Sequence, residues 1–374
     1  MHRPLAGFIV CALLFGIAFE INAILYTSPP LPPLFSSAKE ETTASATPPL
    51  STAVISTGKT VEKPSLKTEN KEITAKPIPP PPSPAPPAPA PEPFSFNTLN
   101  LETRAALVNI LCKADTRSPV SGTSGSGIII DSRGVILTGA HIAQYFLIQD
   151  HVPPGSLDCV IRTGSPAVPR YHAQLLYISP EWVRANYKTL SEENPRGTGE
   201  YDYGLLVITD STSGADLPSS FPFLSIGDSD AEITQGTTIL AAGYPAEFLS
   251  GTTIERDLYA LTTVVPVSKV YTFLADTIDV FAFDGSLISE KGSSGGPIVS
   301  PQGHVGGLIV TSTQGETTGV RTTHAITSSY INRAFKASTG KSITDLLNSD
   351  LRTTAENFAV SFESELANLI LSSL

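Results

Sequence analysis

The sequence predicts an all-β fold of two packed barrels. From about Phe96 onward, the chain consists of short aliphatic and β-branched runs such as GSGIIID (125–131), GVILTGA (134–140) and GLLVITD (204–210), separated by Gly, Pro, Asp and Asn. Such runs of four to eight residues, with few long helical patterns, favour a β-sandwich or a β-barrel. About 240 residues is large for one sandwich, so two packed barrels fit the length better.

The first 26 residues (1–26) predict a membrane anchor. Arg3 precedes an uncharged apolar run from Leu5 to Phe19, and apolar residues resume after Glu20. One helix ending at Tyr26 would span about 33 Å, enough to cross the hydrocarbon core of about 30 Å. With Arg3 held inside, the rest of the chain is exported, which predicts a single-pass protein.

A cleaved signal peptide is the alternative for this segment. Cleavage would fall near Ala23, although Ile21 is bulkier than the small residue that such sites prefer. In that case the protein is secreted. Both alternatives place the folded part outside the cytoplasm, in the periplasm or the extracellular space.

Residues 27–96 predict a Pro-rich disordered linker. Of the 32 prolines in the chain, 18 fall between Pro29 and Pro93. This composition cannot bury a core and favours extended polyproline II structure. The linker contains six Lys and six Glu, so the net charge of −11 belongs mainly to the folded part. An acidic domain argues against nucleic acid as a partner.

Three cysteines require separate interpretations. Cys11 belongs to the apolar N-terminal run, whereas Cys112 and Cys159 lie in the exported part, where a disulfide is permitted. The sequence leaves this pairing open. Neither residue has the CxxC spacing of a zinc or redox site, so we predict neither a metal nor another cofactor.

Three residues at the edges of β runs suggest nucleophilic catalysis. A serine hydroxyl needs a histidine to take its proton and usually a carboxylate to orient that histidine. Ser294 lies in the glycine-rich stretch KGSSGGPIVS, His141 follows GVILTGA, and Asp202 directly precedes the strand-like run that begins at Gly204. The order along the chain is His, Asp, Ser.

These motifs resemble those of the trypsin-like serine peptidases, which have the chymotrypsin fold. TGAHI, DYGLL and GSSGGP are similar to the segments that carry the family's histidine, aspartate and serine. The stretch LSIGDSDAEITQGTTILAAGYPAEF further resembles the HtrA-type, DegP-like bacterial peptidases. The similarity covers about residues 108–335 and implies a peptidase domain (97–340) of two six-stranded antiparallel β-barrels, with the active site between them.

The resemblance also implies a role for each site residue. Ser294 would be the nucleophile, His141 the general base and then the general acid, and Asp202 the group that orients the imidazole and stabilises its cation. The backbone N–H groups of Gly292 and Ser294 would form the oxyanion hole.

Two departures from the family pattern matter for regulation and domain content. Ser293 stands where digestive relatives have an Asp that pairs with a new amino terminus, so zymogen activation of that kind is not expected. HtrA-type enzymes have a neutral Asn there. Fewer than 40 residues follow Phe335, too few for the PDZ domain that usually follows an HtrA-type protease domain.

The expected specificity pocket contains Ile288, Thr311 and His324. Ile288 lies six positions before the nucleophile, where trypsin has the Asp that selects basic residues. Cleavage after Lys or Arg is therefore disfavoured. We predict a pocket for small or medium side chains, with a polar or acidic one as the alternative because of His324.

The C-terminal segment (341–374) predicts one amphipathic helix. Its apolar residues follow the spacing of a helical face. They are Ala355, Phe358, Phe362, Leu366, Leu369 and Ile370. We expect this face to cover the barrel, with partner or oligomer contact as the alternative; no other sequence feature supports an oligomer.

The sequence as a whole predicts a membrane-anchored, extracytoplasmic serine endopeptidase. Its substrates would be proteins or peptides, hydrolysed through an acyl-enzyme intermediate. The alternative is a non-catalytic binding or sensing module tethered to the membrane, built on a protease scaffold.

Overall fold

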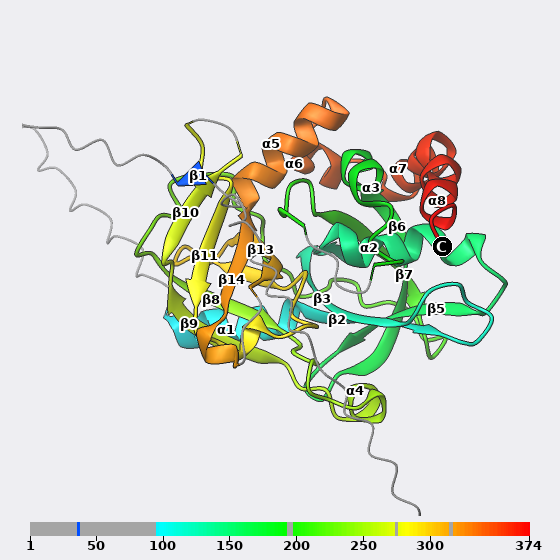
Figure 1. Ribbon diagram of the computed structural model, residues 1–374, viewed down its shortest axis with the longest axis horizontal. Coiled ribbons are helices and arrows are strands. Elements are labelled where there is room, and N and C mark those ends of the chain that lie inside the picture. Colours follow the sequence, from blue (N-terminus) through cyan, green and yellow to red (C-terminus); the bar gives the residue numbers. More distant parts are fainter. Residues whose placement is uncertain (1–35, 38–94, 193–196, 274–275, 314–316) are drawn as a thin grey trace, which may run out of the picture. The chain divides into compact units, whose positions relative to one another are not determined.

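The computed structural model describes residues 36–37, 95–192, 197–273, 276–313 and 317–374 (Figure 1). The predicted anchor and almost all of the predicted linker lie outside these residues. Within them, no helix combines the length and the apolar character needed to cross a membrane.

The first sheet is a closed antiparallel barrel of six strands, as the sequence predicts. Its hydrogen-bonded order is β2-β3-β4-β7-β6-β5. The strands are β2 (Leu107–Ala114), β3 (Thr123–Asp131), β4 (Val135–Thr138), β5 (Leu157–Thr163), β6 (Val168–Ile178) and β7 (Gly204–Ser211). All four residues of β4 are buried, which explains its continuous apolar run.

The second sheet differs from the predicted six-stranded barrel. Its described part has eight strands in the order β1-β10-β11-β14-β13-β12-β8-β9, and the end strands do not pair with each other. The strands are β1 (Ser36–Ser37), β8 (Thr238–Gly243), β9 (Leu261–Pro266), β10 (Lys269–Thr272), β11 (Val280–Asp284), β12 (Pro297–Val299), β13 (Val305–Ser312) and β14 (Thr322–Thr327).

The two additional strands are β1 and β10, and β10 begins at Lys269, just after the run LTTVVPVS that contains β9. β9 ends at Pro266, which has no N–H to continue a ladder. β9 pairs with β8 at one end of the sheet, and β10 pairs with β11 near the other end. The chain between β9 and β10 therefore joins the two ends and makes the sheet barrel-like without closing its hydrogen-bond ladder.

Helices surround the two sheets. They are α1 (Phe96–Ala106), α2 (Ala140–Ile148), α3 (Pro180–Asn186), α4 (Gly251–Arg256), α5 (Ser328–Thr339), α6 (Ile343–Leu347), α7 (Leu351–Phe358) and α8 (Ser364–Leu371). Short 3₁₀ turns are η1 (Gln149–His151), η2 (Leu287–Ser289) and η3 (Thr318–Val320), and η4 (Ala359–Glu363) is a π-helical turn.

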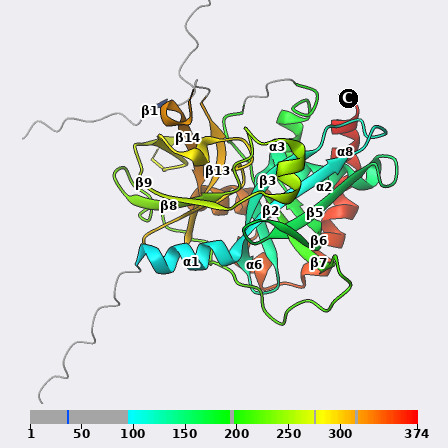
Figure 2. The same cartoon turned by 90° about the horizontal axis from the view of Figure 1, so that it is seen from below.

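Helix α1 connects the two halves of the domain (Figure 2). Ser95 caps its first turn by accepting a hydrogen bond from the Thr98 amide at 3.2 Å. Arg104 donates to the carbonyl oxygen of Ala260, just before β9, at 3.1 Å. Because α1 runs directly into β2 of the first barrel, it ties that barrel to the second sheet.

The C-terminal segment covers the first barrel, as predicted, but not as one regular helix. Helices α7 and α8 pack against β6, α2 and α3, with η4 between them. The predicted residues Ala355, Phe358, Leu366 and Ile370 are buried, whereas Phe362 is exposed. The wider i→i+5 turn shifts the phase of the helix, so the face expected from 3.6-residue periodicity is broken there.

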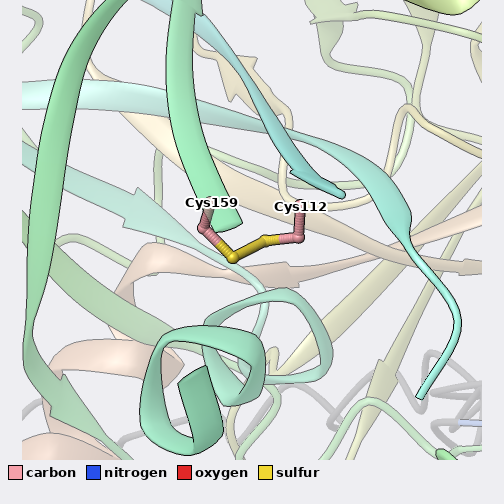
Figure 3. The surroundings of a disulfide bond; sticks show 2 residues. All are labelled: Cys112 and Cys159. Atoms are coloured by element: carbon pink, nitrogen blue, oxygen red, sulfur yellow. A yellow bond between two sulfur atoms is a disulfide. The ribbon is translucent and has the colours of Figure 1, made fainter. Parts of the chain in front are cut away.

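Cys112 and Cys159 form a disulfide between β2 and β5 (Figure 3). The two residues are direct partners in the antiparallel register of these strands. The structure thus settles the pairing that the sequence left open. Among the described residues, no group of three or more His, Cys, Asp or Glu side chains is arranged to hold a metal ion.

Candidate active site

The centre of the site is a paired histidine and aspartate at the edge of the first barrel. His141 is the second residue of α2, which begins directly after β4, and Asp202 lies two residues before β7. His141 Nδ1 lies 2.8 Å from Asp202 Oδ2 and 3.0 Å from Oδ1. The backbone amide of His141 also donates to Oδ1 at 3.0 Å. These contacts leave the other ring nitrogen, Nε2, for a nucleophile.

The small residue before the helix makes this pairing sterically feasible. A Cβ atom added at Gly139 would lie 2.7 Å from His141 Cε1 and 3.4 Å from Asp202 Oδ1. A side chain at position 139 would therefore displace the imidazole. The glycine of the TGAHI motif thus leaves space for the His141 ring.

Opposing effects set the protonation of His141. Burial lowers the pKa of its imidazole, whereas the charge of Asp202 and the hydrogen bond to it raise the pKa. The net effect is a pKa above the ordinary value of 6.5. The side chain of His141 is still 26% exposed, so a substrate or nucleophile can reach the ring.

A strained turn positions Asp202. Tyr201 has φ of 57°, in the left-handed region that a bulky residue rarely adopts. Its amide donates a hydrogen bond to the hydroxyl of Tyr330 on α5 at 3.0 Å. Such a conformation costs on the order of 1–3 kcal/mol and persists only where neighbouring contacts hold it. Tyr330 therefore helps to set the direction of Asp202, a role without any local sequence signal.

The loop that carries Ser294 depends on two glycines with positive φ. Gly292 has φ of 99° and Gly295 has φ of 79°. A Cβ at Gly292 would lie 2.5 Å from the backbone carbonyl oxygen of Tyr244, and a Cβ at Gly295 would lie 2.2 Å from the backbone carbonyl oxygen of Ser126. The glycines of GSSGGP thus permit both the turn and its close approach to neighbouring backbone.

This loop docks beside the histidine. The amide of Ser126 in β3 donates to the carbonyl oxygen of Ser294 at 2.8 Å. A Cβ added at Gly295 would lie 3.0 Å from the amide nitrogen of Gly139, which itself lies against the His141 ring. Ser294 is partly exposed, and within the described residues its hydroxyl makes no hydrogen bond. Catalytic hydrogen bonds of this kind often tighten only when substrate is bound.

The predicted oxyanion-hole amides have no partner within the described part of the chain. The amides of Ser293 and Gly295 donate to carbonyl oxygens at 3.2 and 2.8 Å, respectively. The intervening amide of Ser294 and the preceding amide of Gly292 make no such bond. Two unused donors two residues apart, beside a candidate nucleophile, are what stabilisation of a tetrahedral oxyanion requires.

Ser293 is enclosed by the protein. Its side chain is fully buried, and its hydroxyl has no partner among the described residues. A Cβ added at Gly243 of β8 would lie 3.1 Å from Ser293 Cβ, so the residue packs tightly against the second sheet. As a neutral side chain, Ser293 cannot form an ion pair.

Sequence reasoning missed Ser126, which contacts the nucleophile loop directly. Its hydroxyl donates to the Gly292 carbonyl oxygen at 2.7 Å and accepts from the Tyr244 amide at 2.9 Å. Thr138 Oγ1 in turn donates to the Ser126 carbonyl oxygen at 2.7 Å. The only sequence signal is a single serine between glycines in GSGIIID, which by itself predicts a strand.

A second set of contacts holds the chain just before Gly292. The Ala246 amide donates to the Lys291 carbonyl oxygen at 2.8 Å, and the Lys291 amide lies 3.4 Å from Glu247 Oε2. Glu247 also forms a salt bridge with Arg321, whose hydrogen bond lowers the pKa of the Glu247 carboxyl. Glu247 thus connects the segment before Gly292 with the segment that contains Arg321.

Of the three predicted pocket residues, two are neighbours in the second sheet, and the third, Ile288, lies in the core. Thr311 and His324 are register partners on β13 and β14. Ser289, which follows Ile288, and Thr323, which precedes His324, share a hydrogen bond of 2.6 Å between their hydroxyls. Ile288 is only 1% exposed and packs in the core of the second sheet. Burial lowers the pKa of His324, so its imidazole is neutral at pH 7.

Comparison with protein families identifies one domain. Residues 125–308 match the family model of the trypsin-like peptidase domain. This stretch is just under half of the chain, and it contains His141, Asp202 and Ser294. Comparison with curated proteins gave no match.

Proposed function

We propose that this chain, which carries a trypsin-like peptidase domain, is a serine endopeptidase. The observation that carries the proposal is the bidentate contact of Asp202 with His141, beside a glycine-rich loop whose Gly292 and Ser294 amides are unused. Ser294 Oγ attacks the substrate carbonyl carbon while His141 Nε2 takes its proton. Asp202 holds the imidazole tautomer and stabilises the cation that forms.

The remaining steps use the same groups. The two amides donate to the oxyanion of the tetrahedral intermediate, and each such donor contributes about 3–4 kcal/mol in the transition state. The protonated His141 then donates its proton to the leaving amine, which yields an acyl-enzyme on Ser294. Water, deprotonated by His141, hydrolyses this ester and regenerates the serine.

An alkyl fluorophosphonate, which labels activated serines, tests this proposal in the full-length chain. Wild-type protein should be labelled, and Ser294→Ala should abolish labelling. Ser293→Ala is the matched control because it removes a neighbouring hydroxyl that has no hydrogen-bond partner in the described part of the chain. If folded wild-type protein stays unlabelled from mildly acidic to mildly alkaline pH, the catalytic proposal fails, and the alternative of a non-catalytic binding module is favoured.

We also propose that the enzyme does not prefer basic residues at P1, the position before the cleaved bond. Ile288 presents no carboxylate for Lys or Arg and is buried in the core. The hydroxyl of Thr311 and the neutral imidazole of its register partner His324 suit a small or medium side chain, with a polar or acidic one as the alternative. Dominant cleavage after Arg or Lys in a peptide library would refute this specificity.

The third proposal concerns location. We propose an extracytoplasmic enzyme of HtrA-like type, anchored by residues 1–26. The disulfide between Cys112 and Cys159 supports an oxidising compartment independently of the N-terminal sequence. Digestion by an added protease in intact cells or spheroplasts tests this location, and protection of the domain until the membrane is broken would contradict it.

A further inference from the structure

We infer that Ser126 is a positioning residue that holds the oxyanion hole in its donor arrangement. This inference rests on the proposed serine peptidase activity. Ser126 lies in β3 of the first barrel, far from the nucleophile in sequence, and its side chain is fully buried. It does not contact the reacting atoms, so its effect must act through the backbone of residues 292–294.

Ser126 binds the peptide units on both sides of the nucleophile's own amide. Its hydroxyl donates to the carbonyl oxygen of Gly292 at 2.7 Å, and its amide donates to the carbonyl oxygen of Ser294 at 2.8 Å. The N–H groups of these same two peptide units belong to Ser293 and Gly295. They donate to carbonyl oxygens at 3.2 and 2.8 Å. Both units are thus fixed at both ends.

Units held at both ends alternate with units held only through their carbonyl oxygens, where Lys291 accepts from the Ala246 amide at 2.8 Å and Ser293 accepts from the Gly296 amide at 2.9 Å. The peptide units whose N–H groups belong to Gly292 and Ser294 lie immediately before each fixed unit. Because each fixed unit restricts the rotation of its neighbour, the two free donors cannot turn away independently. Glycine at position 292 would otherwise allow the loop to adopt other orientations, since its φ is not restricted by a side chain.

The Ser126 hydroxyl also joins the two halves of the domain. It accepts a hydrogen bond from the amide of Tyr244, directly after β8, at 2.9 Å. Removing the hydroxyl leaves both the Gly292 oxygen and the Tyr244 amide without their described partner in a buried region. An unpaired buried group is costly, so the loop should move to find new partners. The contacts between His141 and Asp202 do not involve Ser126.

The experiment compares Ser126→Ala with Ser293→Ala in the full-length chain, using fluorophosphonate labelling rates over a range of pH. Both variants remove one fully buried serine hydroxyl, but among the described residues only the hydroxyl of Ser126 has hydrogen-bond partners. In Ser126→Ala the maximal rate should fall about 10- to 100-fold, because small misplacement of catalytic groups has effects of this size. The apparent pKa of its labelling profile should match that of the wild-type profile. Ser293→Ala should keep the wild-type rate within about twofold.

Hydrogen exchange of the peptide that covers residues 290–296 gives a readout independent of activity. Exchange should accelerate in Ser126→Ala and stay unchanged in Ser293→Ala. If Ser126→Ala does not unfold cooperatively, Ser126→Cys replaces it, because a thiol keeps the shape and donates more weakly. The labelling rate of Ser126→Cys should be lower than that of wild type by less than the 10- to 100-fold expected when the hydroxyl is removed.

Three results would overturn the inference. They are a Ser126→Ala rate within about twofold of wild type, an equal loss in Ser293→Ala, or unchanged exchange of residues 290–296. If wild-type protein is not labelled at all, the proposed activity fails separately. In that case the exchange result alone decides whether Ser126 holds the loop.

Discussion

Removing the disulfide by the double substitution Cys112→Ser and Cys159→Ser should destabilise the domain by a predictable amount. The bond closes a loop with a sequence separation of 47 residues. In the chain-entropy model, opening such a loop lowers the free energy of unfolding by about 4 kcal/mol at 25 °C. Because the two residues already face each other in the β2–β5 ladder, we expect a loss of about 2–4 kcal/mol.

Urea unfolding measures this loss conveniently. The chain has a single tryptophan, Trp182, which is 4% exposed in α3 beside the first barrel, so its fluorescence reports the unfolding of this half. Wild-type protein in reductant should approach the stability of the double variant. A loss below about 1 kcal/mol would refute the entropic reasoning. Two titratable thiols in the native oxidised protein would instead show that Cys112 and Cys159 are not paired.

Three further predictions concern the site and its supports. Wild-type labelling should increase with pH through a midpoint above 6.5, since Asp202 raises the pKa of His141 and only neutral imidazole accepts the serine proton. Asp202→Asn should move that midpoint below 6.5, because burial alone remains, and should slow labelling about 10⁴-fold; an unchanged midpoint would contradict it. Tyr330→Phe should lower the midpoint slightly and slow labelling about 10-fold; wild-type kinetics would exclude a positioning role. Phe358→Ala should lower the free energy of unfolding by about 3–5 kcal/mol, and exposed Phe362→Ala by less than about 1 kcal/mol; equal losses in urea unfolding would contradict the described π turn.

The His141–Asp202 pair and the turn at Ser294 could be predicted because their local geometry leaves a sequence signal. Gly139 precedes His141 because a side chain would strike the ring, and Gly292 and Gly295 occur where the backbone requires positive φ. These constraints act within a few residues, so they appear as short motifs. Three strands of the first barrel, β3, β4 and β7, are likewise visible as apolar runs, whereas β5 and β6 mix buried and exposed residues.

The parts that sequence reasoning missed depend on contacts between distant segments. The hydroxyl of Ser126 bonds to groups 118 and 166 residues away in the chain, and no local pattern specifies such a partner. The π turn in the C-terminal segment preserves an amphipathic composition but changes its phase, so Phe362 was assigned to the wrong face. The separation of β9 from β10 depends on their different partners, since β9 pairs with β8 and β10 pairs with β11.

The same distinction bears on how the site is controlled. The glycines at 292 and 295 permit the active loop geometry, but they permit others equally well, because glycine accepts most backbone conformations. Contacts from outside the loop must therefore select one of these backbone conformations. In this structure they are the contacts of Ser126 on one side and those of Ala246 and Glu247 with Lys291 on the other. Glu247 forms a salt bridge with Arg321, the residue directly before β14. A movement of Glu247 or Arg321 would therefore disturb the proposed oxyanion donors before it disturbed the His141–Asp202 pair. If the proposed activity holds, its control is therefore expected to change the maximal labelling rate while the apparent pKa of the labelling profile stays constant.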